Sequence, residues 1–323
     1  MGSQSKKTRK SGKTLQTARE AGYFGKKLLK KGAAAEAEGK PLGWSMVTWW
    51  QGELIAEAFG INLVFPENYG ALCAAVGQAE QYLEISQSEG FPTTLCGYAQ
   101  NCFGYAKRLK DNGLVPPTDA PGGGLPKPIF LLGSGAACDA RIKWFQALNR
   151  YLDNTPIWIL DIPQTGASEF LIPGNKELSI KFIAGHLRSY VAFLEDLLNT
   201  KLDYDRLKEI VDQTYKTMHL AYEVDKLRRA KPSPMVSTDF WSIMIAHLFL
   251  PFDPEAYAFY ERVYDEVKSK VDNGIEAIPN ERYRMLFGEL PPIPGWWRRS
   301  FTWCGKRGLD PCASGMDPWI CLP

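Results

Sequence analysis

Three short runs of uninterrupted apolar residues constrain the fold of this chain more than any other feature. They cover residues 61–65, 129–132 and 157–160, and the first two are followed by segments with helical spacing at 69–88 and 140–152. A strand that is apolar at every position is buried on both faces, as in a parallel sheet covered by helices. Strands that alternate with helices in this way predict an α/β fold with a Rossmann-like, parallel-sheet lobe.

The sequence is expected to divide into four parts. These are a basic N-terminal arm at 1–38, the cysteine-bearing α/β lobe at 39–175, a helical region at 176–294 and an anomalous tail at 295–323. The α/β lobe is expected to begin with a loop, at 39–50. The helical region contains four segments with helical spacing. The tail holds three of the seven cysteines and four of the ten tryptophans and has no periodicity.

Charge is distributed unevenly along the chain. Residues 1–31 contain ten Lys or Arg and one Glu, a charge of +9, so the remainder carries −7 within a net charge of +2. An acidic body argues against a nucleic-acid-binding protein. The basic arm is expected to be a solvated tail or helix; the alternative is that it docks an acidic partner or CoA phosphates. No apolar run is long enough to span a bilayer and no secretory signal is visible, so we expect a cytoplasmic protein without a membrane partner.

Two cysteines occupy positions that suit a metal ligand. Cys96 and Cys138 each follow a turn-forming or small-residue segment and each opens a helix-periodic run. Unpaired N–H groups and the helix dipole favour thiolate there, and thiolate binds metal. The hypothesis is that both are ligands of one iron–sulfur cluster, and the alternative is that both are plain buried thiols. Cys73 and Cys102 lie within helix-periodic segments and are expected in the core.

Other polar residues near the strand ends have less specific roles. Glu67 follows the end of a strand, and it is either a capping or solvated carboxylate or a substrate-facing acid or base at the mouth of the site. Asp139 is expected to cap a helix and Arg141 to lie at the surface or face a partner. The segment 133–135 lacks the ending of a P-loop, so nucleotide binding by this chain is not expected.

Five segments, in order, resemble the 2-hydroxyacyl-CoA dehydratase/benzoyl-CoA reductase family in its iron–sulfur catalytic subunits. They are residues 60–68 (GINLVFPEN), 95–99 (LCGYA), 138–145 (CDARIKWF), 229–234 (RAKPSP) and 283–289 (YRMLFGE). The resemblance implies two α/β lobes joined through helices. It also implies a 4Fe–4S cluster held by three cysteines of the subunit, with one iron open to another ligand or to the substrate.

Cys96 and Cys138 match the first two ligand positions of the family. The third normally lies in the second lobe, well past residue 283, where this sequence departs from the family pattern. We therefore expect a truncated or frame-shifted member whose second α/β lobe is largely missing, with Cys304 as the alternative third ligand.

The resemblance implies one-electron reduction of an acyl-CoA thioester, of the benzoyl-CoA reductase or 2-hydroxyacyl-CoA dehydratase type. The 138–141 segment favours the reductase branch slightly. Implied partners are a homologous second catalytic subunit, a separate ATP-dependent activator that donates electrons, and the acyl-CoA substrate. One alternative is a non-catalytic assembly or substrate-binding subunit of the same fold without a functional cluster. Another is a domain that binds cobalamin or a further cofactor.

Overall fold

The computed structural model describes residues 14–47, 50–135, 138, 140–163, 166–279, 281–287 and 309–314. The chain forms two compact units. One is Lys26–Asp212, and the other combines Met1–Gly25 with Gln213–Pro323. The division expected from composition, into arm, α/β lobe, helical region and tail, stays a prediction. The expected tail lies outside the described residues except for 309–314.

The unit Lys26–Asp212 is built on a four-stranded parallel sheet. The strands are β1 (Leu42–Ser45), β2 (Asn62–Val64), β3 (Phe130–Ser134) and β4 (Ile157–Leu160), in the order β2-β1-β3-β4. This arrangement confirms the α/β fold expected from the three apolar runs. The prediction of a loop at 39–50 was wrong in part, because this segment contains β1, one of the two inner strands of the sheet. Its short sequence, Leu-Gly-Trp-Ser, lacks a continuous apolar run. The segment is a strand because it pairs with β2 and β3 on its two sides.

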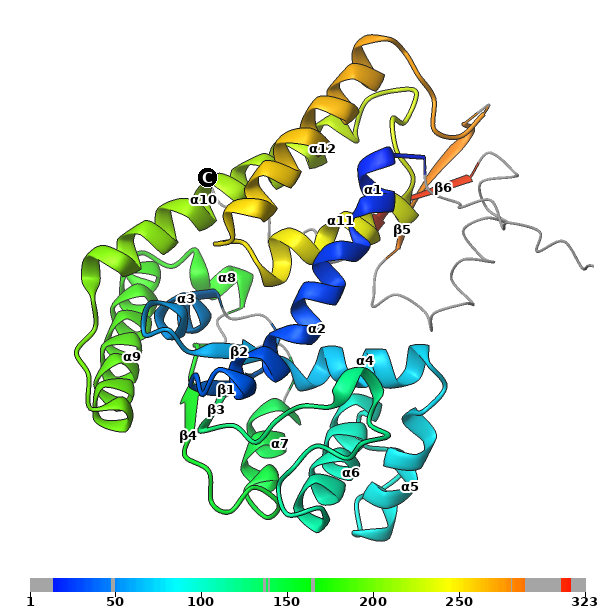
Figure 1. Ribbon diagram of the computed structural model, residues 1–323. Helices are drawn as coiled ribbons and strands as arrows, with labels where there is room; N and C mark the ends of the chain where they lie inside the picture. The colour runs from blue at the N-terminus through cyan, green and yellow to red at the C-terminus, as the bar shows by residue number, and fades with distance from the viewer. Residues whose placement is uncertain are drawn as a thin grey trace, which may run out of the picture. The chain divides into compact units, whose positions relative to one another are not determined.

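Helices cover both faces of this sheet (Figure 1). They are α3 (Trp50–Ala58), α4 (Pro66–Ala75), α5 (Ala79–Ser88), α6 (Gly97–Asp111), α7 (Ala140–Leu148), α8 (Ala167–Phe170) and α9 (Asn175–Leu198). On one face, α9 places Tyr190 and Phe193 against Phe130 of β3, with ring centroids 6.3 and 6.1 Å away. On the other, Leu131 packs in a cluster with Phe145 of α7. Successive residues of β3 thus point to opposite faces, as a strand requires.

The single helix expected at 69–88 is two helices, α4 and α5. Gly77 has φ of +75°, a backbone conformation that glycine adopts without strain, and it separates them. Helices α5 and α6 pack very closely at Gly104, where a Cβ would lie 1.9 Å from the Tyr82 carbonyl oxygen. Glycine is therefore required at this crossing, which fixes the helix that carries Cys96 at its start.

The second unit is mostly helical. It contains α1 (Gln16–Glu20), α11 (Ser237–Phe249), α12 (Pro254–Asp272) and the parallel strand pair β5 (Tyr283–Phe287) and β6 (Leu309–Ser314). Helices α2 (Gly22–Ala37) and α10 (Tyr204–Leu227) each run from one unit into the other. In the helices that the structure describes, no segment combines the length and apolarity needed to cross a bilayer.

The start of α1 is held by two acidic side chains. The Asp239 carboxylate accepts hydrogen bonds from the Thr14 backbone N–H at 2.8 Å and from its hydroxyl at 2.5 Å. Glu266 accepts from the backbone N–H of Thr17 at 3.0 Å and from its hydroxyl at 2.7 Å. Residues 14–17 are thus fixed to α11 and α12, because carboxylates satisfy the unpaired N–H groups at the helix start.

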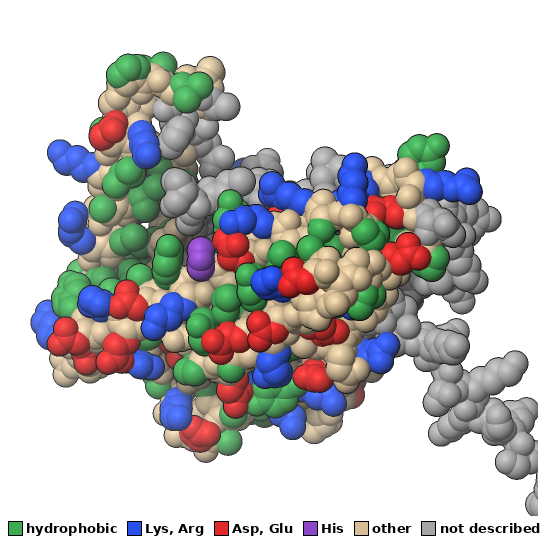
Figure 2. Space-filling view, turned by 90° about the horizontal axis from the view of Figure 1, so that it is seen from above, with side chains coloured by type: hydrophobic (Ala, Val, Ile, Leu, Met, Phe, Trp, Pro, Cys, Tyr) green, Lys and Arg blue, Asp and Glu red, His purple; other side chains and the backbone are tan. Residues whose placement is uncertain are grey.

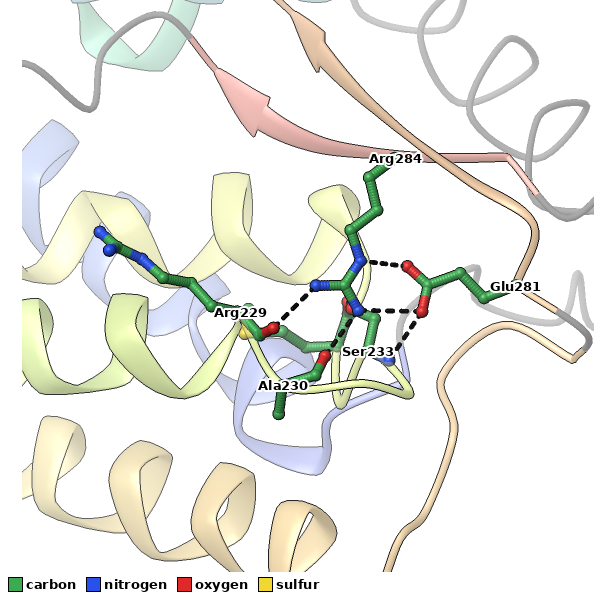
Figure 3. A network of polar contacts seen from close by, with 6 residues as sticks. Arg229, Ala230, Ser233, Glu281 and Arg284 are labelled. Carbon is green, nitrogen blue, oxygen red and sulfur yellow. Dashed lines mark hydrogen bonds and ion pairs between the residues drawn. The ribbon is translucent and has the colours of Figure 1, made fainter.

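A polar network ties β5 to the loop before α11 (Figure 3). The Arg284 guanidinium donates to the carbonyls of Arg229 at 3.0 Å and Ala230 at 2.5 Å, and it pairs with Glu281. Glu281 also accepts from the Ser233 N–H at 3.1 Å. Two of the five segments behind the family resemblance, 229–234 and 283–289, therefore meet in space.

Surface charges of both signs are mixed on the face shown in Figure 2. Many form pairs along single helices. Lys107–Asp111, Lys208–Asp212 and Lys268–Asp272 each have an N···O distance of 2.6 Å. Pairs of this kind at i and i+4 stabilise exposed helix faces modestly.

Candidate functional site

The carboxyl edge of the parallel sheet brings the expected site residues together. In the order β2-β1-β3-β4 the connections leave β1 and β3 in opposite directions, so the switch point lies between these two strands. Ligands of open α/β sheets bind in the crevice at such a point. Val47 follows β1, Glu67 follows β2, and Cys138 follows β3.

Glu67 and Arg141 form a half-buried ion pair across this edge. Arg141 Nη2 lies 3.3 Å from Glu67 Oε2, and the same oxygen accepts from the Val47 backbone N–H at 2.5 Å. Arg141 Nη1 donates to Ser134 Oγ at 3.3 Å. Arg141 is only 5% exposed. The pair links the segments that follow three of the four strands and so holds the mouth of the site in one shape.

The expectation that Arg141 lies at the surface or faces a partner was wrong. Its side chain folds inward from the first turn of α7 because Glu67 and Ser134 accept its hydrogen bonds. Burying an arginine is costly unless its charge is paired. The partner is a residue 74 positions away in sequence. No local pattern could therefore reveal it. The expected cap, Asp139, lies outside the described residues.

The environment of Glu67 shifts its pKa upward. Burial raises the pKa of this carboxyl, and the Arg141 charge and the hydrogen bonds from Val47 and Arg141 oppose the rise without cancelling it. A carboxyl with a raised pKa exchanges its proton at higher pH than an ordinary carboxyl, which suits a general acid or base.

Cys96 is the N-cap residue of α6, and its side chain is exposed. It makes no side-chain capping bond. The segment before it is held by Gln100, whose amide donates to the carbonyls of Leu95 at 2.6 Å and Thr93 at 3.3 Å. The thiol thus stands on a fixed turn at the start of a helix, as the sequence predicted.

Cys138 lies just before α7 and is also exposed. Partial burial of its sulfur raises its pKa, and the Arg141 charge lowers it. The charges of Glu67 and Cys96 raise it further, which shows that these groups share one electrostatic neighbourhood. The backbone N–H of Arg141, at the helix start, lowers the pKa of Cys138 as expected, but burial together with Glu67 and Cys96 leaves the net pKa raised. A bound cation would reverse the balance, since metals bind the deprotonated thiol.

The two exposed thiols are of a type that binds soft metals. Thiolates are the usual ligands of iron–sulfur clusters. Across residues 14–47, 50–135 and the other described segments, no group of three or more His, Cys, Asp or Glu is arranged to hold a metal ion. Cys96 and Cys138 would thus supply two ligands, and the others would come from outside these segments. Cys304 lies outside them.

The two other described cysteines are in the core, as expected. Cys73 and Cys102 are 0% and 2% exposed. Burial raises the pKa of Cys73 to about 11 and that of Cys102 to about 12. Both stay neutral thiols near pH 7, so they serve as internal controls for the two exposed cysteines.

Comparison with known proteins identifies the family. Residues 52–306 match the model of the 2-hydroxyglutaryl-CoA dehydratase D-component family. The chain belongs to this family. The resemblance inferred from five short segments is thereby confirmed.

Several relatives of the family are similar over most of the chain. The (R)-2-hydroxyisocaproyl-CoA dehydratase alpha subunit of Clostridioides difficile is 27% identical over 80% of this chain and 60% of its own length. The (R)-phenyllactyl-CoA dehydratase alpha subunit of Clostridium sporogenes is 25% identical over 87% and 65%. A benzoyl-CoA reductase subunit of Thauera aromatica is 24% identical over 64% and 47%. The chain thus spans about three fifths of the length of the dehydratase subunits that it matches.

Proposed function

We propose that this chain is an iron–sulfur subunit of an enzyme that processes an acyl-CoA thioester. The observation that supports the proposal is that Glu67 and Cys138 both follow strands at the carboxyl edge of the parallel sheet, with Cys138 under the electrostatic influence of Glu67 and Cys96. Two soft ligands and one carboxyl with a raised pKa suit a site that combines a metal cluster with proton transfer. Membership of a family of acyl-CoA dehydratase and reductase subunits supports the substrate class.

In this proposal Cys96 and Cys138 hold a 4Fe–4S cluster, with further ligands from outside the described residues. When bound, the cluster supplies one low-potential electron for the thioester carbonyl. Glu67 gives or takes a proton at the acyl group. Arg141 holds the Glu67 carboxylate in place through Nη2, and Gln100 holds the turn that presents the Cys96 thiol.

Of the two activities, we favour dehydration of a 2-hydroxyacyl-CoA over reduction of an aromatic ring. Four dehydratase alpha subunits match over 80 to 91% of this chain, whereas the benzoyl-CoA reductase subunit matches over 64%. This ordering differs from the slight preference for the reductase branch that the 138–141 segment gives. Loss of a hydroxyl group needs a proton donor, and Glu67 with its raised pKa fits that role.

The proposal includes a cytoplasmic location and two protein partners. The relatives are named as alpha subunits, which supports a homologous second subunit. The second proposed partner is an ATP-dependent activator that delivers the electron, as the family resemblance implies.

The test is turnover by the anaerobically purified complex of this chain, its second subunit and the activator. We expect water loss from at least one 2-hydroxyacyl-CoA and a fall of about 100-fold or more in kcat for Glu67→Gln. Glu84→Gln, a change at an α5 position outside the site, is the control and should leave kcat unchanged. Turnover of benzoyl-CoA without turnover of any 2-hydroxyacyl-CoA would show an enzyme of the reductase type. A complex that binds acyl-CoA but turns over neither class would favour the alternative, a non-catalytic assembly or substrate-binding subunit.

A further inference from the structure

Tyr98 lies inside the proposed site and has no role so far. It is the second residue of α6, two positions after Cys96. Its ring packs on α4 at Gly70, where an added Cβ would lie 3.2 Å from Tyr98 Cδ1. Gly70 is three residues after Glu67, and residues at i and i+3 share one face of a helix. The Tyr98 ring is therefore held one helical turn from the Glu67 side chain.

The Tyr98 phenol differs from the other tyrosines of this core. Tyr105 is fully buried, and its hydroxyl is bonded to the carbonyl of Leu125 at 2.8 Å and to its N–H at 2.6 Å. Tyr98 is half-buried, and no hydrogen bond of its hydroxyl is seen within the described part of the chain. This hydroxyl is not among the buried hydroxyls that lack a partner, as those of Tyr69 and Tyr82 are.

A tyrosine phenol is protonated at neutral pH and offers one O–H donor. Because the Tyr98 ring is packed against α4 while no hydrogen bond of its hydroxyl is seen among the described residues, that donor remains for a bound molecule.

We propose that Tyr98 donates its phenolic hydrogen to the thioester carbonyl oxygen of the acyl-CoA substrate. The carbonyl is the acceptor because it gains negative charge when the thioester takes up an electron, and a fixed O–H donor stabilises that charge. Glu67 is left to exchange a proton elsewhere on the acyl group. This assignment rests on the proposed function. It adds a hydrogen-bond donor for the thioester carbonyl, a role that the two cysteines and Glu67 do not have in the proposed function.

The test compares two ligands and two proteins. The ligands are an acyl-CoA thioester and the matching thioether, which has CH₂ in place of the carbonyl. The proteins are the wild-type complex and its Tyr98→Phe variant, with affinities measured anaerobically by calorimetry without turnover. We expect Tyr98→Phe to bind the thioester about 3- to 10-fold more weakly and the thioether with unchanged affinity. The carbonyl stretch of the bound, ¹³C-labelled thioester should shift to higher frequency in the variant.

Tyr105→Phe is the matched control. It loses two buried hydrogen bonds to Leu125, so its Tm should fall while its thioester affinity stays the same. Tyr98→Phe should keep the wild-type Tm, because no hydrogen bond of the Tyr98 hydroxyl is seen in the described residues.

Three results would overturn the inference. One is equal loss of affinity for thioester and thioether, or no loss for either. Another is an unchanged carbonyl stretch. A third is a fall in the Tm of Tyr98→Phe as large as that of Tyr105→Phe, which would give the hydroxyl a structural role. A wild-type complex that binds neither ligand would refute the proposed function itself. A wild-type complex that binds both ligands, with Tyr98→Phe behaving identically, would refute only the role of Tyr98.

Discussion

Replacing Arg141 by methionine removes a buried charge while keeping much of the side-chain volume. Arg141 is 5% exposed, and its guanidinium donates to Glu67 and Ser134, each at 3.3 Å. Removal of one member of a buried pair typically costs about 3–5 kcal/mol. Glu67 keeps its bond from Val47, and its side chain is 22% exposed, so partial solvation reduces the penalty. We expect Arg141→Met to lower the free energy of unfolding by about 2–3 kcal/mol.

A double-mutant cycle separates the ion pair from loss of packing. Glu67→Gln keeps an acceptor for the Val47 N–H but leaves Arg141 without its counter-charge, and we expect a loss of about 1–3 kcal/mol. The double variant should lose about 1–2 kcal/mol less unfolding free energy than the sum of the two single losses. Equilibrium unfolding in urea measures all four proteins. Two single variants within about 0.5 kcal/mol of wild type, or strictly additive losses, would refute the role of the pair.

The burial of Glu67, which outweighs the effect of Arg141 on its pKa, gives a pH dependence with a definite sign. The folded-state pKa of Glu67 is raised above the ordinary carboxyl value of about 4.3. At pH values between these two pKa values, the native state binds more protons than the unfolded state. Stability due to Glu67 is therefore full below this window and falls as the pH rises through it. The difference in stability between wild type and Glu67→Gln should shrink as the pH rises. A difference that stays constant or grows as the pH rises would show that the pKa of Glu67 is not raised in the folded state.

Three further changes test the packing around the site and in the second unit. Burial lowers the pKa of His247 to about 4, so wild type should lose about 3 kcal/mol as the pH falls from 6.5 towards 4, and His247→Phe should show a flatter unfolding profile. Gly104→Ala places a Cβ 1.9 Å from the Tyr82 carbonyl oxygen and should cost about 3 kcal/mol or more in urea unfolding. Gly185→Ala, with open space at the Cβ, is its control and should stabilise α9 by about 0.5–1 kcal/mol. Arg284→Met removes donors to two backbone carbonyls and a carboxylate, and it should lower the calorimetric Tm with a loss of about 2–3 kcal/mol.

The sequence predicted those parts of the fold that depend on local pattern. The three apolar runs predicted β2, β3 and β4, because a strand buried on both faces carries its signal in its own residues. Strand β1 was missed, since Gly43 and Ser45 interrupt its apolar character and its neighbours in the sheet determine it. The break between α4 and α5 could have been read from Gly77, whose positive φ ends α4.

The candidate site was predictable only where a residue acts through its own position in the chain. Cys96 and Cys138 stand at helix starts, and that is visible in sequence. Arg141 and Tyr98 were missed because their roles depend on contacts with α4, far away in sequence. The contact between Thr14 and Asp239 is another case, since 225 positions separate the two residues. Tertiary pairing of this kind leaves no periodic signal.

The most direct test of the account is the iron and acid-labile sulfide content of the protein after anaerobic reconstitution. If Cys96 and Cys138 are cluster ligands, wild type and Cys102→Ala bind equal amounts of iron, whereas Cys96→Ala and Cys138→Ala each lose most of theirs. Cys102 is the matched control because its thiol is buried and protonated. A wild-type protein without iron, or iron content unchanged in both Cys96→Ala and Cys138→Ala, would contradict the claim.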